Sequence, residues 1–401
     1  MPAATVMFGC DSFLRRTRRP KGAFVVTHRI HVVTFLVVLV FAALAQAQTF
    51  TTLYNFTGGS AGEYPAAGMV RDSAGNLYGT TAGNYSSNCG TVFEVTSSGT
   101  EVVLHSFTGS DGCNPYGPVV RDSAGNLYGT TYYGGSSYRG VVFKIDTTGT
   151  ETVLHSFTGG ITDGYSPGGG LARDKAGNLY GMTNQGGAFD LGTVYKLSTT
   201  SSFTLLYSFR GGANGQYPTY SQPMLDKMGN IYGVASGGTS GYGVVFELTT
   251  SGTFRVLHSF AGGSTDGCYC YASPKRDKNG NIYGTTNGCG SAGEGTIWKL
   301  TAKRSYTLLH SFAGGDGSGP GGGVVLDSTG NLYGSTEAGG ASNYGTLYQL
   351  SSSGTLTLLH SFSYSDGSYP FGELWRDSTG GLYGITSSGG SNGLGTVWQY
   401  K

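Results

Sequence analysis

Short apolar runs alternate with polar, glycine-rich turns along almost the whole chain. Between residues 69 and 107 there are four such runs, at 69–72, 77–81, 91–95 and 102–107, and they are rich in β-branched and aromatic side chains. Gly, Ser, Asn and Asp separate them, as is typical of β-strands joined in a meander. No stretch of this segment has the 3.6-residue period of a helix. The pattern predicts a four-stranded antiparallel sheet.

This unit recurs seven times, and its clearest marker is the sequence G-N-L-Y-G at residues 75–79. The spacing between copies is 50 to 52 residues. A period in this range is typical of propellers and solenoids, and one four-stranded sheet per repeat matches a propeller blade. The marker tyrosine lies at Tyr78, Tyr128, Tyr180, Tyr232, Tyr283, Tyr333 and Tyr383.

The two ends of the repeat array distinguish a ring from a solenoid. A Phe marks the fourth strand, and its first copy, Phe56, precedes every other kind of strand. The chain therefore opens with a fourth strand at 51–56 and closes with a third strand at 396–400. A solenoid would leave the opening strand unpaired. We predict an all-β fold over residues 48–401, a seven-bladed β-propeller of four-stranded antiparallel blades, with the ring closed by the N-terminal strand.

Residues 1–47 differ from the rest of the chain. Basic residues between Arg15 and Arg29 precede an apolar run at 32–44, and Ala45-Gln46-Ala47 follows. This order predicts a secretory signal peptide cleaved after Ala47. The apolar run is shorter than the roughly 20 residues that span a bilayer. We expect a secreted or periplasmic protein with no stable membrane span after cleavage.

The composition excludes several classes of function. Only 12% of the residues are charged, against about 25% in an ordinary domain, and the net charge is +1. A nucleic-acid partner is therefore not expected, because such proteins carry clustered Lys and Arg. The sequence has no G-x-S-x-G, H-E-x-x-H or P-loop motif, so it predicts no catalytic residue, no metal site and no cofactor.

Five cysteines follow residue 47, and an oxidising compartment favours their pairing. Cys89 lies in the loop after the second strand of the first unit, and Cys113 lies in the crossover that leaves this unit. We predict a bridge between them. Cys289 lies in the corresponding loop of the fifth unit, and the crossover that enters this unit holds Cys268 and Cys270. We predict a second bridge from Cys289 to one of these two cysteines, which leaves one thiol free.

Three motifs recur in nearly every copy: D-x-x-G-N-L-Y-G, G-T-V-F and L-H-S-F-x-G-G. Over residues 49–401 they resemble the GloVer-type glycine-rich tandem repeat of exported bacterial proteins. The resemblance implies an exported repeat protein, and it carries no catalytic residue to any position of this chain.

Residues present in every copy are expected to build the fold. We predict that the marker tyrosines, the fourth-strand Phe and the third-strand ring pack in the core. A histidine recurs on the fourth strand, and we expect it to make a structural hydrogen bond, since Tyr replaces it at Tyr54 and Tyr207. An Asp recurs before the first turn and is expected to cap that turn. The histidines are His105, His155, His258, His310 and His360. The aspartates are Asp72, Asp122, Asp174, Asp226, Asp277, Asp327 and Asp377.

The variable loops are the better candidates for a ligand site. In an antiparallel blade, the loop after strand two and the crossover to the next blade share one face. Carboxylates beside exposed aromatic rings suit a sugar, which they would hold by hydrogen bonds and stacking. The alternative is loop scaffolding, because Asp-Gly is also a common turn pair. The candidates are the crossover residues Asp111, Asp163, Asp266, Asp316 and Asp366, with Tyr64, Tyr165, Tyr217 and Tyr369.

These observations favour an exported, non-enzymatic binding or surface-interaction module whose partner is a carbohydrate or a cell-surface protein. The first alternative is a carbohydrate-active hydrolase or lyase that uses acids on the loop-rich face. Two facing carboxylates support such chemistry, and the acids unique to single loops are Glu63, Asp190, Glu294 and Glu337. The second alternative is a purely structural repeat protein of the cell surface.

Overall fold

The structure is a computed structural model, and it describes residues 48–83, 88–218 and 220–401. The chain divides into two units, Met1–Gln48 and Thr49–Lys401. The expected signal peptide, residues 1–47, lies outside the described residues. All that follows concerns the second unit.

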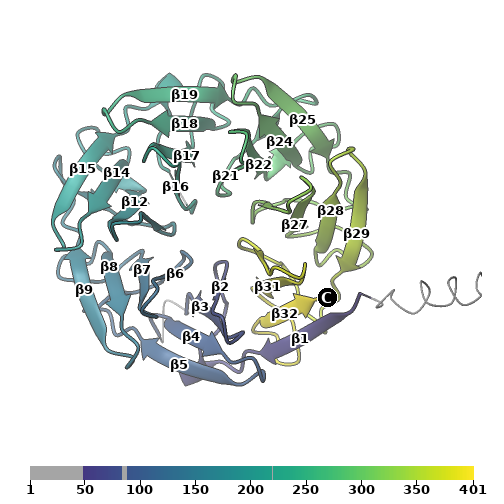
Figure 1. The fold of residues 1–401 in the computed structure, drawn as a ribbon, viewed down its shortest axis with the longest axis horizontal. Helices are drawn as coiled ribbons and strands as arrows, with labels where there is room; N and C mark the ends of the chain where they lie inside the picture. Colours follow the sequence, from purple (N-terminus) through teal and green to yellow (C-terminus); the bar gives the residue numbers. More distant parts are fainter. Residues whose placement is uncertain (1–47, 84–87, 219) are drawn as a thin grey trace, which may run out of the picture. The chain divides into compact units, whose positions relative to one another are not determined.

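The unit Thr49–Lys401 is a ring of seven four-stranded antiparallel sheets (Figure 1). The two-residue first strands lie nearest the centre, and the six-residue outer strands run along the circumference. Blades 1 to 3 consist of β2 (Val70–Arg71), β3 (Leu77–Thr81), β4 (Thr91–Val95) and β5 (Glu101–Ser106); β6 (Val120–Arg121), β7 (Leu127–Thr131), β8 (Val141–Ile145) and β9 (Glu151–Ser156); and β11 (Ala172–Arg173), β12 (Leu179–Thr183), β14 (Thr193–Leu197) and β15 (Phe203–Ser208).

Blades 4 to 6 repeat this order. They consist of β16 (Met224–Leu225), β17 (Ile231–Ala235), β18 (Val244–Leu248) and β19 (Phe254–Ser259); β21 (Lys275–Arg276), β22 (Ile282–Thr286), β24 (Thr296–Leu300) and β25 (Tyr306–Ser311); and β26 (Val325–Leu326), β27 (Leu332–Thr336), β28 (Thr346–Leu350) and β29 (Leu356–Ser361). The predicted β-propeller is confirmed. Among the described residues no helix is long and apolar enough to cross a membrane.

Blade 7 joins the two ends of the unit. It consists of β30 (Trp375–Arg376), β31 (Leu382–Thr386), β32 (Thr396–Tyr400) and the N-terminal β1 (Phe50–Asn55). The β1–β32 ladder runs from the pair Phe50 and Tyr400 to the pair Asn55 and Thr396. The Phe50 ring stacks on His360 of blade 6, with ring centroids 3.9 Å apart. Closure by the N-terminal strand is therefore confirmed.

A glycine on the second strand sets the packing inside each blade. Gly79 pairs with Phe93 on the third strand, and an added Cβ on Gly79 would lie 2.7 Å from that ring. The same glycine in the other blades would bring a Cβ to 2.3–2.7 Å from the third-strand ring. Because a real Cβ does not come so close, only Gly lets the ring lie against the second strand. The glycines are Gly79, Gly129, Gly181, Gly233, Gly284, Gly334 and Gly384.

The third-strand ring also joins each blade to its neighbour. The Phe that follows the outer strand of one blade meets the third-strand ring of the next blade, with centroids 5.1–5.7 Å apart in all seven joints. Nearly all of these contacts have the edge-to-face geometry that aromatic pairs prefer. Both rings are buried at every joint. Core packing is thus confirmed for the fourth-strand Phe and for the third-strand ring, whereas several marker tyrosines are only half-buried.

Two disulfides pin loops to crossovers. Cys89 bonds Cys113, as predicted, and Cys289 bonds Cys268. The short pair β20 (Gly267–Cys268) and β23 (Gly288–Cys289) brings Cys268 beside Cys289. Cys270 is a free, buried thiol at the position that holds Pro in the other six copies. Burial raises the pKa of Cys270 to about 12.

Removing the closing strand tests the ring. A chain that begins at Gly58 loses the β1–β32 ladder and the buried Phe56, and it exposes the edge of β32. We expect a loss of several kcal/mol from a stability of about 5 to 15 kcal/mol. Thermal unfolding beside a chain that begins at Gln48 measures this loss. An unchanged midpoint would contradict closure.

Removing each disulfide tests the loop anchors. The bridges span 24 and 21 residues of sequence. Replacing either pair by Ser should lower the free energy of unfolding by about 3 kcal/mol, because the unfolded chain regains loop entropy. Urea unfolding measures the loss. Alkylation of the denatured, unreduced chain that begins at Gln48, and so lacks Cys10, is the control and should label Cys270 alone; labelled Cys113 or Cys268 would refute the assignment.

Candidate functional site

The connections between strands lie at opposite ends of the blades. One end, the turn face, holds the tight turns between strands one and two and between strands three and four. The other end, the loop face, holds the loops after strand two and the crossovers between blades. Crossovers and loops are hydrogen-bonded to each other, as in the pair β10 (Gly164–Tyr165) and β13 (Gln185–Gly186) and in the 2.8 Å bond from the Cys113 N–H to the Tyr133 carbonyl. The expected common face is therefore confirmed.

The crossover aspartates are bound within the protein. Asp163 accepts hydrogen bonds from His155 Nε2 at 3.3 Å, from the Thr158 N–H at 2.9 Å and from the Gly164 N–H at 2.7 Å. Burial opposes ionisation of Asp163, but these bonds outweigh it and lower its pKa. The other crossover aspartates make the same contacts with a histidine and a backbone N–H. The His–Asp pairs are His105–Asp111, His155–Asp163, His258–Asp266, His310–Asp316 and His360–Asp366.

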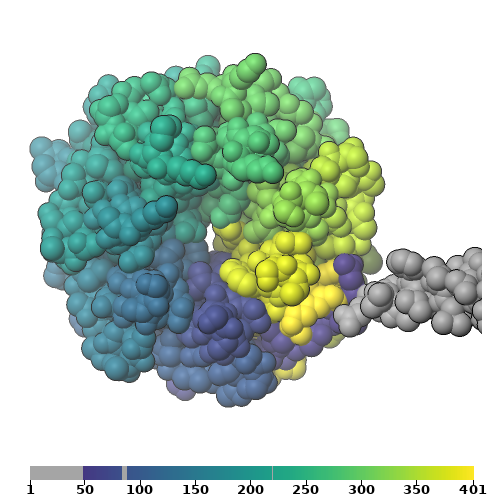
Figure 2. Space-filling model, in the orientation of Figure 1, coloured from purple at the N-terminus to yellow at the C-terminus, as the bar shows by residue number. Residues whose placement is uncertain are grey.

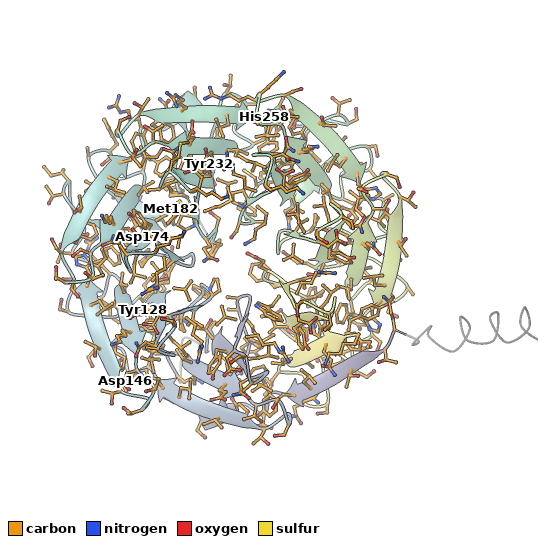
Figure 3. All side chains as sticks on the ribbon, in the orientation of Figure 1. Tyr128, Asp146, Asp174, Met182, Tyr232 and His258 are labelled. Atoms are coloured by element: carbon orange, nitrogen blue, oxygen red, sulfur yellow. A yellow bond between two sulfur atoms is a disulfide. The ribbon has the colours of Figure 1, made fainter. Side chains whose placement is uncertain are left out.

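This geometry confirms that the histidines make structural hydrogen bonds. Figure 3 shows His258 at the outer strand β19, far from the centre of the ring. A ligand role for the five aspartates stays a prediction, and a ligand would have to compete with their internal bonds.

Two copies replace the His–Asp pair as a unit. Tyr54 and Tyr207 stand in the histidine position, and the crossovers after them lack the Asp. These crossovers instead form the 3-10 turns η1 (Gly59–Ala61) and η2 (Gly212–Asn214). The two positions therefore change together, because a histidine without its carboxylate would lose its partner at the blade wall.

The outer strand of the next blade covers these side chains. Phe254 stacks on Tyr207 with centroids 4.1 Å apart, and Tyr306 stacks on His258 at the same distance. Two copies have a glutamate here. Glu101 accepts a 2.8 Å bond from the Tyr54 hydroxyl, while burial and the nearby Asp111 charge raise the pKa of Glu151 to about 7.

Most of the charged residues that recur from copy to copy lie on the turn face. Asp72 caps its turn by accepting from the Ala74 and Asn76 N–H groups, both at 2.9 Å, and from the Tyr78 hydroxyl at 3.0 Å. Arg121 of the next blade lies over the Tyr78 ring. An Arg of the next blade covers five of the marker tyrosines in this way, and Tyr180 and Tyr283 are instead covered by a Lys on the third strand of their own blade. The predicted turn caps are confirmed.

Every crossover has a residue with a left-handed backbone at the same equivalent position. The N–H of Tyr64 donates to the Leu394 carbonyl of the preceding blade, and its carbonyl accepts from the Ala82 N–H of the next. This residue thus bonds two blades together. The φ values run from 48° to 63°, a region that favours Gly and Asn. The residues are Tyr64, Asn114, Ser166, Tyr217, Tyr269, Gly319 and Tyr369.

The four predicted tyrosines differ in their surroundings. Tyr64 and Tyr369 are exposed on the loop face. Tyr165 is half-buried under Arg139, whose guanidinium carbon lies 4.4 Å from the ring centroid, and its hydroxyl donates to Asp190 at 3.4 Å. Tyr217 is also half-buried. Only two of the four therefore offer an exposed ring.

The loop face holds further exposed tyrosines that the sequence reasoning did not select. Among the described residues, seven tyrosines are exposed, by 36% to 64%, and all seven lie in crossovers or in loops after strand two. The five tyrosines that the sequence reasoning missed lie outside the three recurring motifs. A search for tyrosines outside these motifs could have identified them. The seven are Tyr64, Tyr138, Tyr220, Tyr269, Tyr271, Tyr364 and Tyr369.

The crossovers converge on a narrow axial mouth, and Figure 2 shows a small opening at the centre of the ring. Tyr116, Tyr220, Tyr271 and Phe371 line it, together with small residues of blades 1 and 6. The Lys275 ammonium and the Glu373 carboxylate form an ion pair there, 2.5 Å apart. The cavity measures about 40 Å³, far below the 300 Å³ or more of a usual small-molecule pocket.

A larger hollow of about 590 Å³ lies at the outer wall between blades 3 and 4. Phe189, Tyr207, Arg210 and Phe254 line it together with aliphatic and small residues. It contains no acid, so it offers no carboxylate pair for hydrolysis.

The acids unique to single loops are also engaged. Asp190 accepts from the Gly186 N–H at 2.9 Å, and Glu294 accepts from the Ser318 hydroxyl. Glu337 accepts from Asn287 at 3.4 Å, and burial raises its pKa. Glu63 also has a partner in the structure. Within the described part of the chain, no group of three or more His, Cys, Asp or Glu residues could hold a metal ion.

The His–Asp pairs should make stability depend on pH in the acid range. The folded-state pKa of Asp163 is lowered, so its contribution is complete above the unfolded-state pKa of about 3.9 and disappears as the pH falls through the folded-state pKa. Asp163→Asn removes a charged acceptor and should cost about 1.5 to 3 kcal/mol at pH 7.

Urea unfolding of both proteins between pH 3 and pH 7 tests this expectation. The difference between them should shrink below about pH 4, the region in which the carboxylate begins to be protonated in the unfolded wild-type chain. A difference that is equally large at pH 3 and pH 7 would instead indicate a loss of packing.

Comparison with solved structures supports the fold alone. The extracellular domain assigned to a hybrid two-component system of B. thetaiotaomicron has a TM-score of 0.54 at 15% identity over 88% of this chain. A second extracellular domain, assigned to a one-component system of the same organism, has a TM-score of 0.56 at 12% identity over 87% of this chain. The chain spans only 41% and 39% of the length of these two structures. A gluconolactonase of Xanthomonas campestris has a TM-score of 0.45 at 15% identity, with coverage of 90% of this chain and 92% of its own.

Comparison with curated proteins found no match. A protein-family model, described as the Gloeobacter/Verrucomicrobia repeat, matches residues 34–236 and 219–401. The resemblance expected from the repeated motifs is thereby confirmed, and the chain belongs to the Gloeobacter/Verrucomicrobia repeat family.

Proposed function

We propose that the protein is an exported, non-enzymatic binding module whose loop face contacts a carbohydrate or a protein at the cell surface. The observation that carries the proposal is the location of the exposed tyrosines, all seven of which lie on this face among the described residues. Tyrosine is favoured at contact surfaces because its ring buries apolar area while its hydroxyl makes hydrogen bonds.

The backbone conformation of several tyrosines supports the proposal. Tyr64, Tyr138, Tyr220, Tyr269 and Tyr369 are exposed and have φ values of 54° to 62°. A residue other than Gly or Asn in this conformation costs on the order of 1 kcal/mol or more. At the crossover position of Tyr64, Tyr269 and Tyr369, other copies have Asn114 and Gly319, so the fold does not require Tyr at that position. We infer that these rings serve binding.

The location outside the cytoplasm rests on the disulfides and on the expected signal peptide. Two disulfides anchor loop-face segments, and disulfides persist in oxidising compartments. They hold the face in one shape, which reduces the entropy lost on binding. Secretion or a periplasmic location suits both features.

A double variant separates binding from folding. Tyr64→Asn with Tyr369→Asn removes two exposed rings but keeps a residue that tolerates left-handed φ, as Asn114 does. We expect binding to bacterial surfaces or polysaccharides to fall at least about tenfold, a loss of about 1.4 kcal/mol, while the thermal midpoint stays equal or rises.

Met228→Asn is the matched control, because Met228 is exposed on the turn face and should not affect binding. Turnover of any polysaccharide by the wild type would instead favour the hydrolase alternative. Equal binding by the double variant and the wild type would refute the loop face as the contact surface.

A further inference from the structure

Five tyrosines of the loop face form a connected row. Tyr138 contacts Tyr133 with centroids 6.0 Å apart, and Tyr133 contacts Tyr132 at 4.7 Å. These three residues belong to the loop of blade 2. Tyr132 then meets Tyr116 at 5.7 Å, and Tyr116 meets Tyr220 at 6.1 Å. The row thus runs from the blade 2 loop to the axial mouth and on to the crossover that enters blade 4.

A second set of rings continues from the mouth. Tyr271 lines the mouth together with Tyr116 and Tyr220. Its ring is nearly parallel to Tyr269, with an angle of 16° and centroids 6.4 Å apart, and Tyr269 contacts Tyr242 at 5.9 Å. We call the whole set the tyrosine track. Its members are Tyr138, Tyr133, Tyr132, Tyr116, Tyr220, Tyr271, Tyr269 and Tyr242.

Comparison of the copies shows that the repeat does not require the track. The residue after the conserved Pro is Tyr116 in blade 2 but Ala66 in blade 1 and Gly321 in blade 6. Tyr220 lies in a crossover with one additional residue between Pro218 and Asp226. Since blades fold with small residues at these positions, the rings are not needed for packing.

Most polar groups beside the track are neutral or already paired, and Arg139, which follows Tyr138, lies over the Tyr165 ring. Asn184 donates to the Tyr132 hydroxyl at 3.2 Å, and its Oδ1 is a buried acceptor that no donor among the described residues satisfies. The charges of Lys275 and Glu373 at the mouth neutralise each other. The track therefore offers aromatic faces, hydroxyls and amides, but little net charge to hold an ionic ligand.

We propose that the tyrosine track binds an uncharged, linear polysaccharide that lies across the axial mouth. This inference rests on the proposed function and names its ligand. A sugar ring has an apolar face that stacks on tyrosine and hydroxyls that bond to Tyr and Asn side chains. Successive aromatic contacts favour a chain of rings over a single one. A peptide is less suited, because its anchor side chains need pockets, and the mouth measures only about 40 Å³.

The test compares variants on and off the track. Tyr116→Ala and Tyr271→Ala each remove a ring at the mouth, and Tyr116→Phe restores one of them. Met228→Ala is the control, because Met228 is exposed but lies on the turn face, away from the track. Calorimetry with neutral oligosaccharides of increasing length, an anionic polysaccharide and a proline-rich peptide measures affinity. Thermal unfolding confirms that each variant is folded.

We expect the affinity of the wild type for one neutral oligosaccharide series to rise with chain length. Tyr116→Ala and Tyr271→Ala should each lose at least tenfold and flatten this dependence, whereas Tyr116→Phe and Met228→Ala should bind like the wild type. Equal losses in Met228→Ala, no dependence on length, or preference for the anionic polymer or the peptide would overturn the inference. If no polysaccharide binds while cell-surface binding still depends on Tyr64 and Tyr369, the inference fails and the proposed function stands; if neither binds, both fail.

Discussion

The close contact between a second-strand glycine and a third-strand aromatic ring is the constraint on which the ring of blades depends. In each blade the glycine has no Cβ, so the ring lies directly against its backbone. The outer edge of that ring then receives the Phe of the preceding blade. Each joint thus links two neighbouring blades through buried aromatic area, and a terminal blade without a neighbour would expose it. Closure by β1 removes that exposure.

Polar side chains reinforce the same joints from the outside and from the turn face. A His–Asp pair, or a Tyr with a 3-10 turn, closes the outer wall between blades. On the turn face, Asp caps the first turn and an Arg or Lys covers the marker tyrosine. Only 12% of the residues are charged, and most of the charged residues that recur from copy to copy belong to these pairs, caps and ring contacts. The loop face exposes seven tyrosines, beside the apolar Ile161 and Phe189.

The two faces differ because some positions of the repeat can change from copy to copy and others cannot. Positions that make the joints keep the same residue type in nearly every copy, since a change would expose a ring or leave a buried carboxylate unpaired. Crossovers and loops have only to connect strands and supply backbone hydrogen bonds, so their side chains are free to differ. The tyrosines with left-handed φ show that this freedom was used at a cost in backbone energy. We attribute this cost to the proposed binding role of these tyrosines. Two disulfides hold loop-face segments in place.

The sequence by itself determined the blade, the blade count, the ring closure and the Cys89–Cys113 bridge. These features follow from local patterns and from the order of strand types, which a regular repeat copies seven times. Only the tertiary structure decided that Cys268 rather than Cys270 bonds Cys289, because the choice depends on how β20 pairs with β23. It likewise assigned the crossover aspartates to histidines six or eight residues upstream and joined tyrosines of blades 2, 4 and 5 around one mouth. Contacts between side chains of different blades depend on the closed ring, and no periodicity along the chain encodes them.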